Sequence, residues 1–529
     1  MRRWNGWGDE QTAYPLPATG RKLLETYLGR LQPQPDADLA DVVKGVPQSR
    51  LPEHPLISQD ASERVLHARG QSLPDWVTRR FGQIGVYPDG VAYPASAGEV
   101  RQLLDFARLE QLHLIPYGGG TSVLGHINPL AGDTPVLTLD MSRMNHLLDL
   151  DKTSQLAVFE AGVTGPHLES QLNPLGFTLG HFPQSFERSS LGGWIATRST
   201  GQQSYYYGRI EQLFAGGLLE TPAGMQELPE FPASAAGPDL RQLVLGCEGR
   251  LGVITQATVR VRRLPEIEAF YGVFFPDWES GAQAVRHIAQ EHIPVSMLRL
   301  SDPLETAMTL SLSGKEQLVR LAERGLRLLG VGDAPCLLVY GVTGSQSATR
   351  SAHRQADSIL RRFGGLNTGQ FIGKQWCKSR FLFPYLRNTL WDIGIALDTL
   401  ETALPWRSVI QAATEIKAVI QQAQAAAGRR VWVFTHLSHV YGDGASIYIT
   451  YVFPQEADPC ATLERWQAMK TAASQAIVRN HGTISHQHGV GLDHKPYLLA
   501  EIGELGLQTL GAVAQVYDPA GMMNPGKCF

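Results

Sequence analysis

The chain has 529 residues, of which 43% are hydrophobic, so it can bury a large core and is too long for one compact domain. Its formal net charge of −4 and the absence of any long block of like charges argue against nucleic acid as a partner. Five cysteines, odd in number and far apart, argue against a disulfide framework or a zinc site, and no apolar run is long enough to span a bilayer. We therefore expect several domains, a reducing compartment and no metal.

The first 85 residues mix aromatic residues, prolines and short helical patterns. The spacing of apolar residues over 21–31 predicts one such helix. We expect residues 1–85 to form a helical lead-in segment rather than an independent domain, anchored by the burial of Trp4 and Trp7.

The first glycine-rich loop follows a predicted strand, a helix over 97–110 and a second strand over 113–115. Three consecutive glycines let the backbone adopt positive φ and approach a ligand closely, and the two hydroxyls after them add donors. The loop predicts a phosphate cradle, with a tight connection between strands as the alternative, and it has neither the P-loop nor the Rossmann spacing. Its candidate cofactor-binding residues are Pro116, Gly118, Gly119, Gly120, Thr121 and Ser122.

Two further glycine-rich stretches follow. The second begins at Gly180 and is rich in small residues and hydroxyls, and its glycine pair at 192–193 opens a predicted helix whose N-terminus favours an anion. The third, residues 246–255, is a turn that leads into a strand. The candidate cofactor-binding residues of these stretches are Pro183, Gln184, Ser185, Ser189, Ser190, Gly192, Gly193, Thr197, Glu248, Gly249, Leu251, Gly252, Val253 and Ile254.

Together the three loops resemble the flavin-binding domain of the vanillyl-alcohol oxidase family, in which FAD lies across the domain with its pyrophosphate on the first loop. Within that family the resemblance narrows to the alkyldihydroxyacetonephosphate synthases and covers nearly the whole chain. It implies an α+β fold, with a two-subdomain FAD-binding domain and a cap domain that has an antiparallel sheet and flanking helices. The matching stretches include residues 4–8, 191–194, 207–211, 401–406 and 485–491.

The resemblance also divides the chain. It implies the N-terminal helical segment 1–85, the FAD-binding domain 86–265, the cap or substrate domain 266–479, and a C-terminal segment 480–529 that returns to the FAD-binding domain. Strand-like and helix-like runs within the cap range agree with this division.

His486 and His488 are the leading candidates for proton transfer. Two residues apart, they would share one face of a strand, and imidazoles titrate near neutrality, although such a pair also serves packing or metal ligation. The family has three consecutive histidines at 486–488. In this chain the middle position is Gln487, a neutral amide that cannot relay a proton at pH 7. The resemblance further implies catalytic roles for His181 and Tyr448, with a hydrogen-bonded loop histidine and a core aromatic as the alternatives.

Arg299 and Arg387 match arginines expected at the substrate end. A guanidinium can hold a phosphate through two parallel N–H bonds, and a structural ion pair is the alternative for each residue. The implied reaction exchanges the fatty acyl group of acyl-dihydroxyacetonephosphate for a fatty alcohol, with FAD as an electrophile and no net redox change. The expected partners are these lipids, and the apolar channel they need is represented by scattered aromatics at Phe371, Trp376, Phe381 and Phe383.

An FAD-dependent oxidoreductase acting on a D-2-hydroxy acid is the alternative function. Residues 439–444 and the ending at 523–527 resemble segments of the D-2-hydroxy-acid dehydrogenases. Those enzymes often hold a divalent metal with the histidine that matches His439, a second histidine and a glutamate. The last two positions are here Tyr448 and Gln487, which are poor replacements for imidazole and carboxylate. A binding or scaffold protein without activity is disfavoured by the intact glycine loops.

The two ends of the chain show no recognisable targeting signal. The last three residues are not a peroxisomal address, and no secretory or transit peptide precedes Trp4. We expect a cytoplasmic enzyme that works peripherally at the inner membrane surface, and a homodimer is compatible with this expectation.

Overall fold

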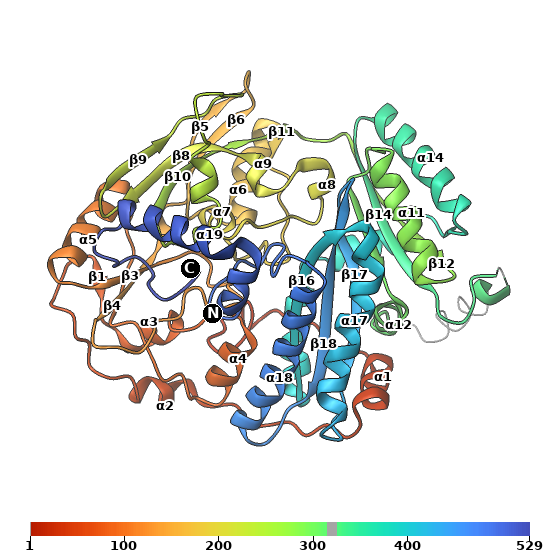
Figure 1. The fold of residues 1–529 in the computed structure, drawn as a ribbon, viewed down its shortest axis with the longest axis horizontal. Helices are drawn as coiled ribbons and strands as arrows, with labels where there is room; N and C mark the ends of the chain where they lie inside the picture. Colours follow the sequence, from red (N-terminus) through yellow and green to blue (C-terminus); the bar gives the residue numbers. More distant parts are fainter. Residues whose placement is uncertain (1, 315–324, 329) are drawn as a thin grey trace.

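The computed structural model describes residues 2–314, 325–328 and 330–529, which form two bodies side by side (Figure 1). The N-terminal body contains two sheets from the first half of the chain together with the C-terminal helix. The cap contains one large sheet with helices on it. Residues 315–324 and 329 of the predicted cap domain lie outside the described residues.

Short helices make up much of the N-terminal segment, which contacts both bodies. The last of them begins at a capping box, in which the Ser72 hydroxyl accepts from Asp75 N and the Asp75 carboxylate accepts from Ser72 N. Trp7 is buried in the core of the cap, and Trp4 packs against a smaller cluster. The helices are α1 (Ala18–Leu28), α2 (Leu39–Lys44), α3 (Ala61–Leu66) and α4 (Leu73–Arg80).

The first sheet of the N-terminal body positions the first glycine loop. Its order is β1-β2-β4-β3, and β4 runs parallel to both of its neighbours. Helix α5 (Ala97–Leu109) buries its apolar face and contacts both sheets of this body. The loop leaves the carboxyl end of β3, the edge at which such sheets bind ligands. The strands are β1 (Ile57–Ser58), β2 (Gly90–Ala92), β3 (His113–Tyr117) and β4 (Val136–Asp140).

The second sheet is antiparallel, with the order β5-β6-β10-β8-β9, and it carries the second and third glycine loops on adjoining elements. Helix α7 (Leu191–Thr197) contacts β10, which follows the third loop directly. The strands are β5 (Leu147–Asp151), β6 (Leu156–Glu160), β8 (Phe214–Thr221), β9 (Gly224–Leu228) and β10 (Val253–Arg260). The remaining elements are α6 (Gly165–Leu172), α8 (Ser204–Tyr207), α9 (Ile210–Leu213), α10 (Arg241–Val244), and the pair β7 (Phe177–Thr178) and β11 (Arg262–Arg263).

The cap is built on a seven-stranded antiparallel sheet of order β15-β12-β14-β13-β17-β18-β16. Its strands are β12 (Ile267–Phe275), β13 (Met297–Ser301), β14 (Cys336–Gly344), β15 (Leu366–Asn367), β16 (Ile395–Pro405), β17 (Trp432–Val440) and β18 (Gly444–Pro454). Its helices are α11 (Trp278–Gln290), α12 (Pro303–Ser311), α14 (Gln346–Arg362), α15 (Phe371–Ser379), α16 (Phe383–Asp392), α17 (Trp406–Ala425) and α18 (Pro459–Arg479).

The two faces of the cap sheet have different neighbours, because side chains along a strand alternate. Ile447, Ile449 and Tyr451 of β18 belong to the large core formed with α11, α14, α17 and α18. Tyr448 and Val452, on the opposite face of the same strand, line a cavity. The alternation in β18 therefore places one face in the core and the other toward the N-terminal body.

The C-terminal segment returns to the N-terminal body, where Met523 pairs with Leu114 beside β3. Its helix α19 (Lys495–Tyr517) bends at Gly503, whose φ of 71° is not helical. The predicted α+β fold, with a two-sheet domain and an antiparallel cap, is confirmed by this architecture. Among the helices of the described ranges, none combines the length and the apolar character needed to cross a membrane.

We predict that Ile449→Ala destabilises the cap, because Ile449 is fully buried in its core and truncation leaves a cavity. The expected loss in the free energy of unfolding is about 2–5 kcal/mol, measured by urea denaturation followed by circular dichroism. Leu505→Ala is the matched control, because the Leu505 side chain is 77% exposed. Equal unfolding midpoints for the two variants would contradict this assignment of the core.

Candidate active site

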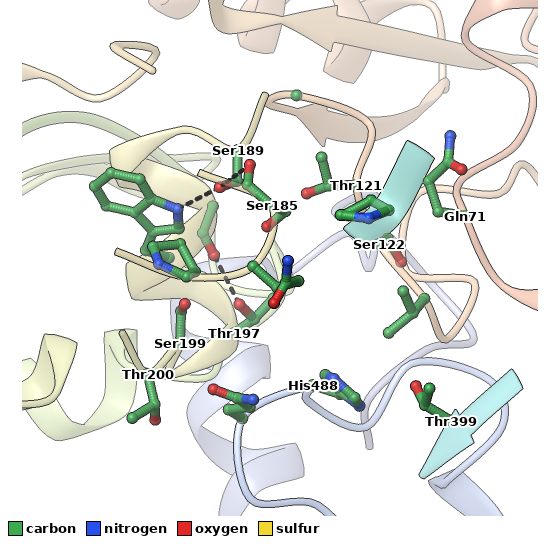
Figure 2. Close-up of a pocket in the computed structure, with 18 of the residues that line it drawn as sticks. Gln71, Thr121, Ser122, Ser185, Ser189, Thr197, Ser199, Thr200, Thr399 and His488 are labelled. Atoms are coloured by element: carbon green, nitrogen blue, oxygen red, sulfur yellow. Dashed lines mark hydrogen bonds between the residues drawn. The ribbon is translucent and has the colours of Figure 1, made fainter. Parts of the chain in front are cut away.

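A cavity of about 480 Å³ lies between the two bodies and reaches all three glycine loops and the cap sheet. Figure 2 shows hydroxyls of the first two loops, including Thr121, Ser185 and Ser189, gathered on one side of the pocket, with Thr399 and His488 across from them. The cavity has three parts: the glycine loops, a polar centre beneath the cap sheet, and an apolar arm within the cap.

The first two loops approach each other too closely for side chains at their contact. A Cβ at Gly119 would overlap the backbone carbonyl of Arg188, and a Cβ at Gly118 would overlap the Ser190 hydroxyl. Gly120 has a φ of 68°, a conformation that favours glycine. The glycines therefore form a backbone surface around the cavity, with side-chain hydroxyls at its rim.

Nearly all of the predicted cofactor-binding residues line this cavity, and Leu251 is the exception. Its side chain is buried in the core of the second sheet, so it supports the third loop from behind. The lining residues from the prediction are Pro116, Gly118, Gly119, Gly120, Thr121, Ser122, Pro183, Gln184, Ser185, Ser189, Ser190, Gly192, Gly193, Thr197, Glu248, Gly249, Gly252, Val253 and Ile254.

This lining fits a flavin dinucleotide. A glycine surface can present backbone N–H groups to a pyrophosphate, and hydroxyls such as those of Thr121 and Ser185 can add hydrogen bonds. The hydroxyls of Ser189 and Thr197 are already held, since Ser189 accepts from Trp194 Nε1 at 2.7 Å and Thr197 donates to Gly193 O at 2.9 Å. We expect the first loop and Ser185 to hold the phosphates, and the third loop to border the rest of the cofactor.

Glu248 has a structural task in addition to its place in the cavity lining. Its buried carboxylate accepts from Val490 N and, at 2.9 Å, from Gly491 N, and it lies 3.2 Å from His126 Nε2. A Cβ at Gly489 would meet this carboxylate at 2.6 Å. Glu248 therefore holds the C-terminal segment against the N-terminal body.

Glu401 performs the same task from the cap. This fully buried carboxylate accepts from the backbone N–H groups of Gln487 and His488, the latter at 2.9 Å. The two glutamates thus hold residues 487–491 from both sides. As a result, Gln487 and His488 line the cavity where the two bodies meet.

Tyr448 lies at the polar centre between two imidazoles. The His436 ring stacks on it with centroids 4.9 Å apart, and the His488 ring meets it edge-on at 5.8 Å. Its hydroxyl donates to Thr399 Oγ1 at 3.1 Å. Burial raises the pKa of Tyr448 above its ordinary value, so the phenol keeps its proton at neutral pH.

Two predicted catalytic histidines do not line the cavity. His181 is buried against Trp194, with its Nε2 hydrogen-bonded to Ser199 Oγ at 3.2 Å. His486 stacks on His439 with centroids 5.0 Å apart, and its Nε2 is hydrogen-bonded to the Tyr441 hydroxyl at 2.6 Å. Burial lowers the pKa of His486 well below its ordinary range and that of His181 to about 3, so both are neutral at pH 7.

His439 and His436 also line the cavity. The sequence pointed to His439 only through the dehydrogenase-like segment 439–444, and it did not point to His436. Both come from β17, which the sequence shows only as an apolar run with interspersed polar residues. Burial lowers the pKa of His439 to about 3. The spacing of the two histidines gave no sign of their facing the cavity, because a shift in register between Leu437 and Val440 interrupts the alternation of the strand.

The two predicted arginines differ in how they are held. Arg299 donates to the buried Glu305 carboxylate at 2.8 Å and to Ser301 Oγ at 3.0 Å, so it forms the structural ion pair that was its alternative role. Glu305 is also hydrogen-bonded to His436 Nδ1 at 2.9 Å. The ion pair keeps Glu305 charged, and Arg299 has part of its hydrogen-bonding capacity committed to the protein.

Arg387 has unused donors. One of its amino groups donates to the backbone carbonyl of Gln71 at 2.6 Å, and its guanidinium lies over the Trp76 ring at 4.4 Å. Its Nε and its second amino group are buried and have no hydrogen-bond partner within the described part of the chain. Burial lowers the pKa of Arg387 to about 10, which leaves the group charged at pH 7. Arg387 is therefore the better candidate for binding an anion in the cavity.

The apolar arm extends from the polar centre between α1, α12, α16 and the cap sheet. Of the four aromatics considered from the sequence, Trp376 and Phe383 line the cavity, Phe371 is exposed, and Phe381 stacks on Phe186 at 4.9 Å instead. The arm belongs to one hydrophobic cluster, and its lining residues are Leu24, Met308, Leu312, Phe383, Leu386, Leu390, Leu397, Phe434 and Val452.

Metal binding has little support at this site. Across residues 2–314, 325–328 and 330–529, no group of three or more His, Cys, Asp or Glu side chains is arranged to hold a metal ion. His439 is not joined by a second imidazole from β18 or by a carboxylate from residue 487, because those positions are Tyr448 and Gln487. The polar centre is better suited to hydrogen bonding and proton transfer.

Comparisons with known proteins agree with this geometry. A family model described as FAD binding domain matches residues 88–226, and one described as FAD linked oxidases, C-terminal domain, matches residues 264–528. The alkyldihydroxyacetonephosphate synthase of Dictyostelium discoideum is 29% identical over 99% of this chain and 93% of its own. A solved alkyldihydroxyacetonephosphate synthase structure has a TM-score of 0.86 at 27% identity, covering 99% of this chain and 98% of its own.

A second group of relatives is more distant. The mitochondrial D-lactate dehydrogenase (cytochrome) of Arabidopsis thaliana is 26% identical over 89% of this chain and 77% of its own. The matches confirm the predicted FAD cofactor and the resemblance to the alkyldihydroxyacetonephosphate synthases. They leave the reaction itself to be argued from the site.

We predict that Gly119→Ala prevents FAD binding, because the added Cβ would overlap the Arg188 carbonyl at the contact between the first two loops. The purified variant is expected to be folded and colourless, as measured by the ratio of flavin to protein absorbance. Gly98→Ala in α5 is the control, since its Cβ would meet only the Ser96 hydroxyl at 3.7 Å. A full complement of flavin in the Gly119 variant would exclude this loop as the cofactor cradle.

Proposed function

The chain belongs to the family of FAD linked oxidases, and on that premise we propose that it exchanges the fatty acyl group of an acyl-dihydroxyacetonephosphate for a fatty alcohol. The products would be an ether-linked alkyl-dihydroxyacetonephosphate and a fatty acid. One bond from the reacting carbon to oxygen breaks and another forms, so the substrate undergoes no net oxidation.

The apolar arm is the observation that carries this proposal. It opens directly from the polar centre and is lined by hydrocarbon side chains from both the N-terminal segment and the cap. A long alkyl chain could displace water from such a surface at a gain of about 0.8 kcal/mol for each buried CH₂ group. A small hydroxy acid would have no use for this arm.

Arg387 supports the phosphate part of the substrate. Its Nε and one amino group are free to donate two hydrogen bonds, and Trp76 and the Gln71 carbonyl hold the guanidinium in place. A buried cation without a charged partner is costly unless a ligand supplies the anion. We assign the phosphate of the substrate to Arg387, with Arg299 and Glu305 as a paired support beside His436.

Tyr448 and His488 are suited to moving protons at the reacting carbon. Bound FAD supplies the electrophilic ring against which that carbon reacts. The Tyr448 phenol, protonated at neutral pH, can donate to an oxygen of the substrate, and the neutral His488 imidazole beside it can accept a proton. Gln487 can hydrogen-bond in the same cavity without carrying charge.

Oxidation of a D-2-hydroxy acid is the second candidate function. It is favoured by the resemblance of residues 523–527 to the ending of the D-2-hydroxy-acid dehydrogenases. Asn524 of this ending lines the cavity and accepts from the buried Lys527 amino group at 2.6 Å. It is disfavoured by Tyr448 and Gln487 at positions where the dehydrogenases hold metal ligands. We rank it below ether formation because it leaves the apolar arm without a role.

The two functions predict different products from the same purified flavoprotein. We expect palmitoyl-dihydroxyacetonephosphate and hexadecanol to give an ether lipid, detected by mass spectrometry, without reduction of an artificial electron acceptor. D-lactate, D-2-hydroxyglutarate and glycolate serve as the parallel substrates. The variant Tyr448→Phe should keep its FAD and lose ether formation. Dye reduction by a hydroxy acid, without any ether product from the lipids, would reverse the ranking.

We predict that Arg387→Met raises the KM for the phosphorylated substrate by about ten- to a hundredfold, the range expected for lost hydrogen bonds to a charged group. The methionine keeps much of the side-chain volume over Trp76. Acyl-dihydroxyacetone without the phosphate is the control substrate, and its KM should be the same for wild type and variant. An unchanged KM for the phosphorylated substrate would remove Arg387 from phosphate binding.

A further inference from the structure

A second hollow, of about 680 Å³, lies on the far side of His439 and His486 from the flavin cavity. Its lining includes Ser204, Arg209, Tyr441 and Gly442, and it is open toward the surface. None of these residues has a part in the function proposed above. Polar side chains, rather than hydrocarbon ones, separate the hollow from the flavin cavity.

His439 forms this wall. Its side chain belongs to the lining of the flavin cavity, and its Nδ1 is hydrogen-bonded to the Ser204 hydroxyl at 3.1 Å. Ser204 in turn lines the hollow. One imidazole and one hydroxyl therefore connect the two spaces. The second ring nitrogen of His439, Nε2, is available to groups in the flavin cavity.

A second pair lies beside the first. His486 stacks on His439, and its Nε2 is hydrogen-bonded to the hydroxyl of Tyr441, which also lines the hollow. Arg209 donates to the backbone carbonyl of His486 at 2.9 Å, and this bond holds the His486 backbone so that its ring stacks on His439. The arrangement orients His439 and brings two of its neighbours to the same hollow.

Chemical balance gives this connection a purpose. When the fatty acid of the proposed exchange departs as its carboxylate, the form stable at neutral pH, one proton per turnover is left in the cavity. The apolar arm is lined by hydrocarbon and would be filled by an alkyl chain, and charge does not cross such a space readily. A polar exit away from the arm would let this proton leave.

We propose that the hollow is the proton port of this site and that His439 and Ser204 transfer the proton through it. The proton enters at His439 Nε2, the proton on Nδ1 passes to the Ser204 hydroxyl, and the proton of that hydroxyl passes to water in the hollow. Tyr441, His486 and Arg209 are positioning residues. The need for a net proton rests on the function proposed above, whereas the connection itself rests only on the geometry.

The neutral state of the ring suits this task. Burial and the nearby Arg209 lower the pKa of His439 to about 3, so the imidazole is neutral at pH 7 and has one ring nitrogen that can accept while the other donates. Arg209, Glu211 and His292 are the other ionisable side chains, besides its tyrosines, that line the hollow.

The first test needs no substrate. Exchange of the imidazole C2 proton with deuterium, followed by mass spectrometry on the FAD-loaded protein, reports the access of water to each histidine. His181 is the internal reference, because its pKa is also lowered to about 3 and it is equally buried, but it bonds to Ser199, which lines only the flavin cavity. We expect His439 to exchange faster than His181, because its partner Ser204 lines the hollow.

Filling the hollow gives a sharper comparison. A Cβ at Gly442 would meet only His292, at 3.9 Å, so Gly442→Trp can occupy the hollow without entering the flavin cavity. The variant should slow the exchange of His439 and leave that of His181 unchanged. Gly132→Trp is the control, because a Cβ there meets nothing within 4 Å and the residue is exposed and far along the chain from the hollow. Equal His439 exchange in wild type and Gly442→Trp would overturn the port.

Turnover provides the second readout. Ser204→Ala should lower kcat by about tenfold or more with KM unchanged, should change the solvent isotope effect, and should be rescued by a small buffer such as imidazole. Tyr206→Phe, which alters the same hollow but bonds to neither imidazole, should behave as wild type. Wild-type kcat and isotope effect in Ser204→Ala would overturn the role of this pair. If wild type makes no ether product, the function proposed above fails, and the exchange experiment alone decides the port.

Discussion

Two buried carboxylates hold the active site together. Glu401 from the cap and Glu248 from the third glycine loop both accept from backbone N–H groups of residues 487–491, and the glycine at 489 leaves room for the Glu248 carboxylate. The segment carries no core of its own and is fixed by these bonds. Because the cavity lies where the cap, the glycine loops and this segment meet, its shape depends on the two glutamates.

The same interface separates three chemical tasks. Glycines and hydroxyls of the N-terminal body surround the cofactor space, the inward face of β17 and β18 supplies His436, His439 and Tyr448, and the helices α1, α12 and α16 close the apolar arm. Arg387 stands between the polar and apolar parts with donors to spare. This division is the basis for proposing a substrate with a phosphate, a reacting carbon and a long chain.

The predictable part of the site is the part made by local backbone. Each glycine loop acts through its own N–H groups and the absence of a Cβ, so its sequence indicates its use, and only Leu251 among the predicted cofactor-binding residues lies outside the cavity lining. The site residues of the cap were harder to predict from the sequence. His439, Glu305 and Gln71 come from separate parts of the chain, and only folding brings them to the site. His486 lies behind His439, outside the cavity lining, where it is hydrogen-bonded to the Tyr441 hydroxyl.

The sequence by itself determined the glycine cradle and many of the local elements, because glycine spacing and strand or helix periodicity are properties of short stretches. The FAD cofactor and the α+β architecture followed from the resemblance of the three loops to the vanillyl-alcohol oxidase family. Only the tertiary structure decided which arginine keeps free donors, which histidines reach the cavity, and that an apolar arm joins the polar centre. Those properties depend on contacts that form only on folding, as when the Gln71 carbonyl, 316 residues away in the chain, accepts from Arg387. Burial and pairing arise from packing, which no single stretch of sequence contains.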